Sequence, residues 1–270
     1  MIFDVWTVGL LLTFGLLAGL LGGMLGIGGS VLMIPALTIA FGPSQHFYQG
    51  AAMIVNFCVA VPSAIRHARA GAVLTPVVRV TIPVAAVTVI AGVWLSSGAW
   101  FRGANEVYLS RLFGAFLLYE AGYNVYRLFS QRRLPDLDEA AAARIPVWKT
   151  GAVVGVPTGL VAGLLGIGGG ALAVPLQQAF LRMPLRRAIA NSAATIVLLS
   201  VIGATYKNYT NLRDGIALWS ALKLAALMAP TAVIGGLIGS GLTHSMPRKL
   251  LRVAVVVLMC YGGIALLRRG

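Results

Sequence analysis

Residues 25–35 read LGIGGSVLMIP, and residues 165–175 read LGIGGGALAVP. The alignment extends without gaps over residues 15–35 and 155–175, at an offset of 140, and 11 of its 21 positions are identical. An apolar composition produces scattered glycine and leucine matches, but it does not explain a GIGG followed by a proline at the same distance in both copies. The chain therefore contains an internal repeat, which predicts two homologous structural units.

The composition predicts an integral membrane protein. Of the 270 residues, 59% are hydrophobic and 10% are charged, whereas a typical soluble domain has about 25% charged residues. A soluble protein of this size lacks the interior to bury so much apolar surface. Soluble enzymes are excluded on this ground, and a disulfide scaffold is excluded because the chain has only two cysteines.

The net charge of +14 would suggest nucleic acid binding in a soluble protein. Here the basic residues lie in short loops between apolar stretches, where they fix the orientation in the membrane. We therefore expect the lipid bilayer as a partner and no nucleic acid. Arg66 and Arg69, together with the basic residues of the middle loop, predict that these loops are cytoplasmic, and the absence of Lys and Arg before residue 66 favours an external N-terminus.

Apolar stretches of the right length predict an all-α fold with four to five helical segments in each repeat. The longest polar stretch, residues 130–149, divides the chain almost in half. It predicts a first transmembrane repeat over residues 1–129, a cytoplasmic linker over 130–147 and a second repeat over 148–270. If each glycine-containing stretch crosses the membrane as two segments, the repeats are inverted, and if it crosses as one, they are parallel. The external N-terminus favours inverted repeats.

The glycine clusters Gly26–Ser30 and Gly166–Gly170 predict a break in each long apolar helix, because glycine weakens a helix by about 1 kcal/mol relative to alanine. Irregular backbone at membrane depth survives only inside protein or beside a wet cavity. A half-helix follows each break, and Ser30 is expected to cap the first one. The free N–H groups at such a helix start favour anions, as in transporters built from repeats. The alternative interpretation is close helix packing through small residues, which we favour for the glycines at positions 15, 19, 23, 155, 159 and 163.

The duplicated GxLxGLLGIGGGxLxVP element resembles that of the TauE/SafE family of bacterial membrane proteins over essentially the whole chain. The resemblance implies a multi-pass protein of the bacterial inner membrane that exports sulfite, sulfoacetate or related organosulfur anions. In the family a hydroxyl-containing pattern, roughly A-x-x-T-S, follows the glycine element. Residues 188–192 match this pattern fairly well, whereas Gly50, Ala51 and Ala52 lack the hydroxyls, and Asn56 is the candidate to replace them.

Polar groups within apolar helices are costly and are often functional. The candidate substrate-binding residues are therefore Gly28, Gly29, Ser30, Asn56, Gly168, Gly169, Gly170, Asn191 and Ser192. The candidates for a gate, or for attraction of an anion, are Arg66, Lys207 and Gln49. For Arg66 and Lys207 the favoured alternative is anchoring at the membrane surface, and for Gln49 the alternative is capping of its helix.

Neither a metal site nor a cofactor is expected, because His46 and His244 lack ligand spacing to other residues. Glu120 is the one acidic residue well inside an apolar stretch, and a hydrogen bond to Asn124 is favoured over a role in proton coupling.

The sequence thus predicts a secondary transporter of small sulfur anions rather than an enzyme. The alternatives are a membrane enzyme, which would need a nucleophile, a base or a metal that the sequence does not supply, and a permease for an unrelated small solute. A homodimer is left open.

Overall fold

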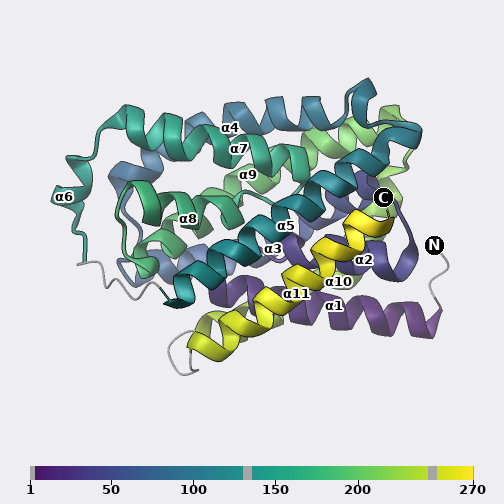
Figure 1. Cartoon of the computed structure of the whole chain (residues 1–270), viewed down its shortest axis with the longest axis horizontal. Helices are drawn as coiled ribbons and strands as arrows, with labels where there is room; N and C mark the ends of the chain where they lie inside the picture. Colours follow the sequence, from purple (N-terminus) through teal and green to yellow (C-terminus); the bar gives the residue numbers. More distant parts are fainter. Residues whose placement is uncertain (1–3, 130–135, 243–247, 270) are drawn as a thin grey trace.

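The computed structural model describes residues 4–129, 136–242 and 248–269, and every regular element in these ranges is helical (Figure 1). The first half contains α1 (Val5–Leu25), α2 (Ser30–Phe41), α3 (Gln45–Arg69), α4 (Thr75–Ser96), the short 3-10 helices η1 (Ala99–Phe101) and η2 (Gly103–Asn105), and α5 (Glu106–Phe129). The second half contains α6 (Glu139–Ala143), the π-helix η3 (Lys149–Gly155), α7 (Val156–Leu165), α8 (Gly170–Phe180), α9 (Leu185–Arg213), α10 (Leu218–Leu242) and α11 (Arg248–Arg269). The all-α prediction is confirmed.

Five of the described helices are long and apolar enough to cross a membrane. These spans are Val5–Met24, Gln45–Arg69, Thr75–Ser96, Leu185–Arg213 and Leu218–Gly241, in α1, α3, α4, α9 and α10. A membrane span needs about 20 residues, so each of these segments suffices for one crossing. The chain is a multi-pass membrane protein, as its composition predicts.

The helices pack in pairs along the long axis of the molecule (Figure 1). Helix α1 packs along α10, and α7 packs along α4. Helices α3 and α9 pack together between these two pairs, and α5 packs along α11. Helix α2 lies toward the end at which α1 begins, whereas α8 lies toward the end that carries α6.

Small residues allow the outer pairs to approach closely. A Cβ atom on Gly15 would lie 2.6 Å from the carbonyl oxygen of Met228, and a Cβ on Gly23 would lie 2.5 Å from that of Gly236. The equivalent glycines of the second half pack against α4. A Cβ atom on Gly159 or Gly163 would overlap a backbone carbonyl of α4, and a Cβ on Gly155 would contact the side chain of Val84. The predicted packing role of these glycines is confirmed.

Gly19→Ala is expected to destabilise the protein, because the new Cβ would overlap the backbone carbonyl of Ala232 in α10. Overpacking of this kind costs about 1–3 kcal/mol. The matched control is Gly9→Ala on the same helix, where no neighbouring atom lies within 4 Å and alanine is the better helix former. Thermal unfolding of the purified protein should show a lower midpoint for Gly19→Ala only. A midpoint equal to that of Gly9→Ala would contradict the close packing of α1 on α10.

The described part of the linker is attached to one end of the bundle. Arg187 at the start of α9 donates from Nε to Asp136 Oδ1 at 3.1 Å and from Nη1 to the carbonyl of Gly71. The hydrogen bond from Arg187 lowers the pKa of Asp136. Glu139 accepts hydrogen bonds from the backbone N–H and the hydroxyl of Thr75 at the start of α4. We call this end, marked by Gly71, Thr75 and Arg187, the linker end, and the opposite end, at which α1 begins and α11 ends, the terminal end (Figure 1).

Candidate functional site

Two short glycine segments separate consecutive helices near the middle of the bundle. The first glycine segment, Gly26–Gly29, connects α1 to α2, and the second, Gly166–Gly169, connects α7 to α8. Gly26 and Gly166 adopt positive φ angles of 67° and 75° at the ends of their helices. This left-handed region is favourable only for glycine, so the sequence itself determines where α1 and α7 end.

The two glycine segments contact each other, although 140 residues separate them in the chain. A Cβ atom on Gly28 would lie 3.5 Å from the carbonyl oxygen of Ile167. A Cβ on Gly170, the first residue of α8, would lie 2.8 Å from the carbonyl oxygen of Gly26. Backbone therefore packs directly against backbone at this meeting point.

Asn56 of α3 lies between the two segments. Its Oδ1 atom accepts a hydrogen bond from the backbone N–H of Ser30 at 3.0 Å, and its Nδ2 donates to Ser30 Oγ at 2.6 Å. A Cβ on Gly168 would lie 2.8 Å from Asn56 Nδ2. The expectation that Ser30 caps α2 is wrong. Gly29 is the N-cap residue, and no side chain caps the helix. The Ser30 hydroxyl instead accepts a hydrogen bond from Asn56.

Several hydrogen-bond donors at the meeting point have no acceptor. Within the described ranges, the backbone N–H groups of Gly28, Gly29, Gly168 and Gly169 find no acceptor. Nearby, Ser192 Oγ donates to the carbonyl of Gly26 at 3.0 Å. Free N–H groups at the starts of α2 and α8, next to small polar side chains, form an arrangement that can bind an anion.

Sequence reasoning missed Ser200 on α9. A Cβ on Gly168 would lie 3.1 Å from Ser200 Oγ, which is buried and has no hydrogen-bond partner. The signal that could have identified it is its position eight residues after Ser192, which places both hydroxyls on one face of a helix.

Other predicted residues lie near the meeting point but do not face it. A Cβ on Gly29 would contact Ala18 of α1, and a Cβ on Gly169 would lie 2.8 Å from Thr158 of α7, so each faces the preceding helix of its own half. Gln49 covers Gly166 and donates from Nε2 to the carbonyl of Leu164 at 3.1 Å.

The structure does not bring Asn191 to the meeting point. Its Oδ1 accepts from the backbone N–H of Leu74 at 2.7 Å, and its Nδ2 donates to Gln177 Oε1 at 3.1 Å. Asn191 therefore connects α9 to α4 and α8 near the linker end. Arg66 is exposed at the same end and donates from Nη1 to Ser240 Oγ at 3.2 Å, which anchors α3 to α10.

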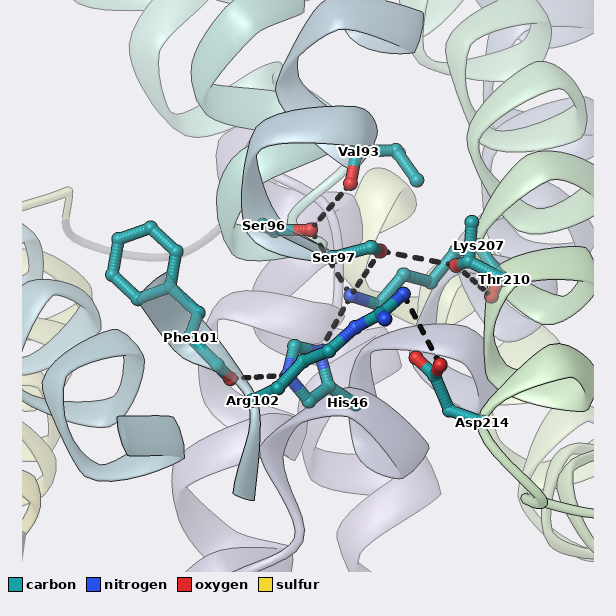
Figure 2. A network of polar contacts seen from close by, with 9 residues as sticks. All are labelled: His46, Val93, Ser96, Ser97, Phe101, Arg102, Lys207, Thr210 and Asp214. Carbon is teal, nitrogen blue, oxygen red and sulfur yellow. Dashed lines mark hydrogen bonds and ion pairs between the residues drawn. The ribbon is translucent and has the colours of Figure 1, made fainter. Parts of the chain in front are cut away.

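Lys207 lies at the terminal end and is completely buried (Figure 2). Its Nζ atom lies 2.7 Å from His46 Nδ1 and 3.0 Å from Ser96 Oγ, so it connects α9 to the start of α3 and the end of α4. The other ring nitrogen of His46 lies 2.7 Å from the carbonyl oxygen of Phe101. Beside this network an ion pair joins Arg102 of the α4–α5 connection to Asp214 at the end of α9, with an N–O distance of 3.1 Å.

Sequence reasoning singled out Lys207 but gave it no partners. His46, Ser96 and Ser97 lie at the ends of α3 and α4, and no spacing connects them to Lys207 along the chain. The network of Lys207, His46, Ser96 and Ser97, which we call the terminal-end network, joins α3, α4 and α9 at this end of the bundle (Figure 2).

A cavity of about 40 Å³ lies between α5 and α8. It extends from Ile27 and Ala171 at the meeting point to Arg127 and Leu185 near the linker end. The residues that line it are Ile27, Glu120, Tyr123, Asn124, Arg127, Ala171, Val174, Pro175, Gln178 and Leu185. In the described ranges no group of three or more His, Cys, Asp or Glu side chains could hold a metal ion, and His244 lies outside these ranges.

Comparison with known proteins agrees with this architecture. The family model described as "Sulfite exporter TauE/SafE" matches residues 11–266. Similar proteins are the "Probable membrane transporter protein MamO" of Magnetospirillum gryphiswaldense, which is 29% identical, and the "Probable membrane transporter protein MJ0441" of Methanocaldococcus jannaschii, which is 26% identical. The "Probable membrane transporter protein YunE" of Bacillus subtilis is 22% identical.

The matches cover 92%, 96% and 94% of this chain, respectively. This chain spans 42% of MamO but 94% of MJ0441 and 98% of YunE. No solved structure matches the chain significantly. Because the family model covers nearly all of the sequence, the chain belongs to the TauE/SafE family.

Proposed function

We propose that this chain is a secondary transporter that exports small anions, namely sulfite or an organosulfonate such as sulfoacetate, across the inner membrane of a bacterial cell. The observation that carries the proposal is the contact between the two glycine segments, where N–H groups without acceptors precede α2 and α8. The start of a helix carries a partial positive charge, so these groups can bind an anion without a buried cation. The names of the relatives, all probable membrane transporters, support this class of function.

We include in this proposal that residues 1–129 and 148–270 are inverted repeats, each with a glycine-broken helix. Reciprocal contacts at the offset of 140 support it, because Ile189 covers Gly26 in the same way as Gln49 covers Gly166. The packing of α1 on α10 likewise corresponds to that of α7 on α4. Transporters with such repeats alternate access to a site that stays near the midplane.

The two ends of the bundle differ in a way that fits one state of this cycle. At the terminal end, the terminal-end network buries Lys207 completely. Between α5 and α8, a cavity of about 40 Å³ is lined by Arg127 and Leu185 on the side of the linker end and by Ile27 and Ala171 at the meeting point. If the linker is cytoplasmic, as the basic residues predict, the structure represents a state that takes up the anion from the cytoplasm.

The membrane potential supplies the driving force in this proposal. A cell that is negative inside favours the exit of an anion by about 2.3 kcal/mol per charge per 100 mV. Sulfonates remain ionised at physiological pH, so they always experience this force. Export then requires no coupled ion.

The experiment that tests the function is efflux from proteoliposomes loaded with ³⁵S-labelled sulfite or sulfoacetate. A potassium diffusion potential, negative inside, is imposed with valinomycin. We expect efflux that the potential accelerates and that protein-free liposomes lack. Efflux of neither anion above the protein-free rate would contradict the proposed function.

Ser192→Ala is expected to weaken anion binding moderately, because the hydroxyl supports the carbonyl of Gly26 beside the free N–H groups. A hydrogen bond of this kind contributes about 0.5–1.5 kcal/mol net, so affinity should fall up to about tenfold without being abolished. Calorimetry with sulfite on the purified protein measures this change. Unchanged affinity, or complete loss of binding in a folded variant, would contradict a supporting role for Ser192.

A further inference from the structure

We propose that the anion leaves the glycine segments along the interface between α3 and α9, and that Ser200, Gln49 and Gln45 bind it on its way to the terminal end. This inference rests on the proposed function, because it assigns the exit path of the same transport cycle. It gives a role to buried polar groups that lie between the meeting point and the terminal-end network.

Four residues of α3 and α9 are buried and carry polar atoms without a hydrogen-bond partner. In the described part of the chain, no partner is found for either amide atom of Gln45 or for Gln49 Oε1, Ser200 Oγ and Asn208 Oδ1. Asn208 Oδ1 lies between the two helices, because a Cβ on Gly50 of α3 would be 2.7 Å away from it. Buried polar groups almost always have partners in a folded protein, so this series indicates groups that bind a ligand in another step of the cycle.

The polar residues of α3 share one face of the helix. Gln49 follows Gln45 by four residues, and Asn56 follows Gln49 by seven, so all three point to the same side. Asn56 lies at the meeting point, where a Cβ on Gly168 would be 2.8 Å from its Nδ2 atom. Gln49 covers Gly166, and Gln45 lies one turn nearer to the terminal end. The polar face therefore runs from the glycine segments to the start of α3.

Ser200 and Lys207 share a face of α9 in the same way. Seven residues separate them, or about 10 Å along the helix. Ser200 Oγ lies at the inner end of the path, 3.1 Å from the Cβ position of Gly168, which also contacts Asn56. Lys207 lies at the outer end, where its Nζ atom is 2.7 Å from His46 Nδ1 (Figure 2). The polar faces of α3 and α9 therefore begin and end together.

The chemistry of these groups matches a small hydrated anion. Hydroxyls and amides donate and accept hydrogen bonds, so they bind both an oxyanion and the water that accompanies it. Lys207 adds a positive charge at the outer end, which attracts an anion along the neutral groups. Two carboxylates at this end are engaged by other groups. Glu106 accepts from the His46 N–H at 2.9 Å, and Asp214 pairs with Arg102.

The buried carboxylate of Glu120 lies outside this path, because it lines the cavity between α5 and α8. The expected hydrogen bond between Asn124 and Glu120 exists, but it does not involve the carboxylate. Asn124 Nδ2 donates at 2.9 Å to the backbone carbonyl of Glu120. Neither α3 nor α9 contains an acidic residue, so the proposed path is lined by neutral groups and by Lys207.

The test removes polar groups from the path and measures both stability and efflux. Ser200→Ala and Gln45→Leu delete buried groups without partners, so the thermal midpoint of each variant should equal or exceed that of the parent. Potential-driven efflux of ³⁵S-labelled sulfite from proteoliposomes should nevertheless fall at least about fivefold, which corresponds to the loss of one hydrogen bond to the anion. A purely structural group would not slow transport in a protein that remains as stable.

The matched control is Thr81→Val on α4, outside both helices of the path. Thr81 is 1% exposed, and among the described residues its Oγ1 atom likewise has no hydrogen-bond partner. The control therefore removes the same kind of group as Ser200→Ala. We expect it to be at least as stable as the parent and to export sulfite at the parent rate.

Thiol labelling follows the path independently of the efflux rate. Cys58 and Cys260 are replaced by alanine, and Lys207→Met opens the terminal end. A membrane-impermeant thiol reagent added from that end should modify Ser200→Cys at least about tenfold faster than Leu199→Cys, because the rate depends on access to the thiol. Leu199 is the neighbouring buried residue, and it contacts Gly169 instead of the path.

Parent-like efflux in either Ser200→Ala or Gln45→Leu would overturn the exit path and leave the proposed transport function standing. An equal loss of efflux in Thr81→Val would also overturn it, because the effect would then not be specific to α3 and α9. A parent protein without efflux would overturn both the path and the proposed function. If a path variant unfolds below the parent, the labelling decides the question, and equal modification of the two cysteines overturns the path.

Discussion

Gly28→Ala is expected to reduce anion efflux at least tenfold in a protein that still folds. Gly28 has a φ angle of 80°, and a Cβ atom there would lie 3.3 Å from Asn56 Oδ1, the atom that accepts the Ser30 N–H. The methyl group would also lie 3.5 Å from the Ile167 carbonyl of the second glycine segment. The methyl group would therefore occupy the space between the two segments. A loss of about 1.4 kcal/mol of binding free energy is enough to lower the affinity for the anion tenfold.

The matched control for Gly28→Ala is Gly215→Ala. Gly215 has nearly the same φ angle, 82°, but no atom lies within 4 Å of its Cβ position. In both variants, alanine in the left-handed region costs about 1–2 kcal/mol of stability. The difference in transport between the two variants therefore reports only the contacts of the new methyl group at position 28. The control is expected to transport like the parent. If Gly28→Ala transports like Gly215→Ala, the anion does not pass between the glycine segments.

The second large effect is expected for Lys207→Met. Lys207 Nζ holds α9 against His46 and Ser96, and hydrogen bonds contribute about 0.5–1.5 kcal/mol net each. Without the amine, the terminal end should open more often. Some of this effect is offset because methionine is easier to bury than lysine. We therefore expect at least a tenfold rise in exposure of the terminal end.

Thiol labelling measures this opening. The native cysteines Cys58 and Cys260 are first replaced by alanine, and Thr210→Cys introduces one thiol next to Lys207 in a buried position. A membrane-impermeant thiol reagent added from the terminal end should modify the new cysteine at least about tenfold faster when Lys207→Met is also present. Equal labelling rates would contradict a closing role for the terminal-end network.

Much of the fold follows from local sequence features. The glycines at positions 26 and 166 end their helices because only glycine adopts their backbone conformation readily, and the small residues of α1 identify its packing face. The GIGG repeat can be recognised in the sequence for the same reason. Its chemistry lies in the backbone, and few residue types other than glycine adopt the backbone conformation that it needs.

The polar contacts were less predictable, because they depend on which helices meet. Asn56 could be identified as a polar residue in an apolar helix, but its bonds to Ser30 replace the predicted cap. Asn191 is likewise a polar residue in an apolar helix, but it accepts a hydrogen bond from the Leu74 N–H and connects α9 to the start of α4 near the linker end. Nothing in the sequence pairs Lys207 with His46, since 161 residues separate them.

The most direct test of the central claim is an experimental structure with selenite, an analogue of sulfite whose selenium atom is located by anomalous scattering. Protein with ordinary methionine avoids competing selenium signals. We expect one strong peak at the meeting point of the two glycine segments, within hydrogen-bond distance of N–H groups of Gly28 or Gly168. A bound anion seen only elsewhere, for example at Arg66 or at the surface of the linker end, would contradict anion transport between the glycine segments.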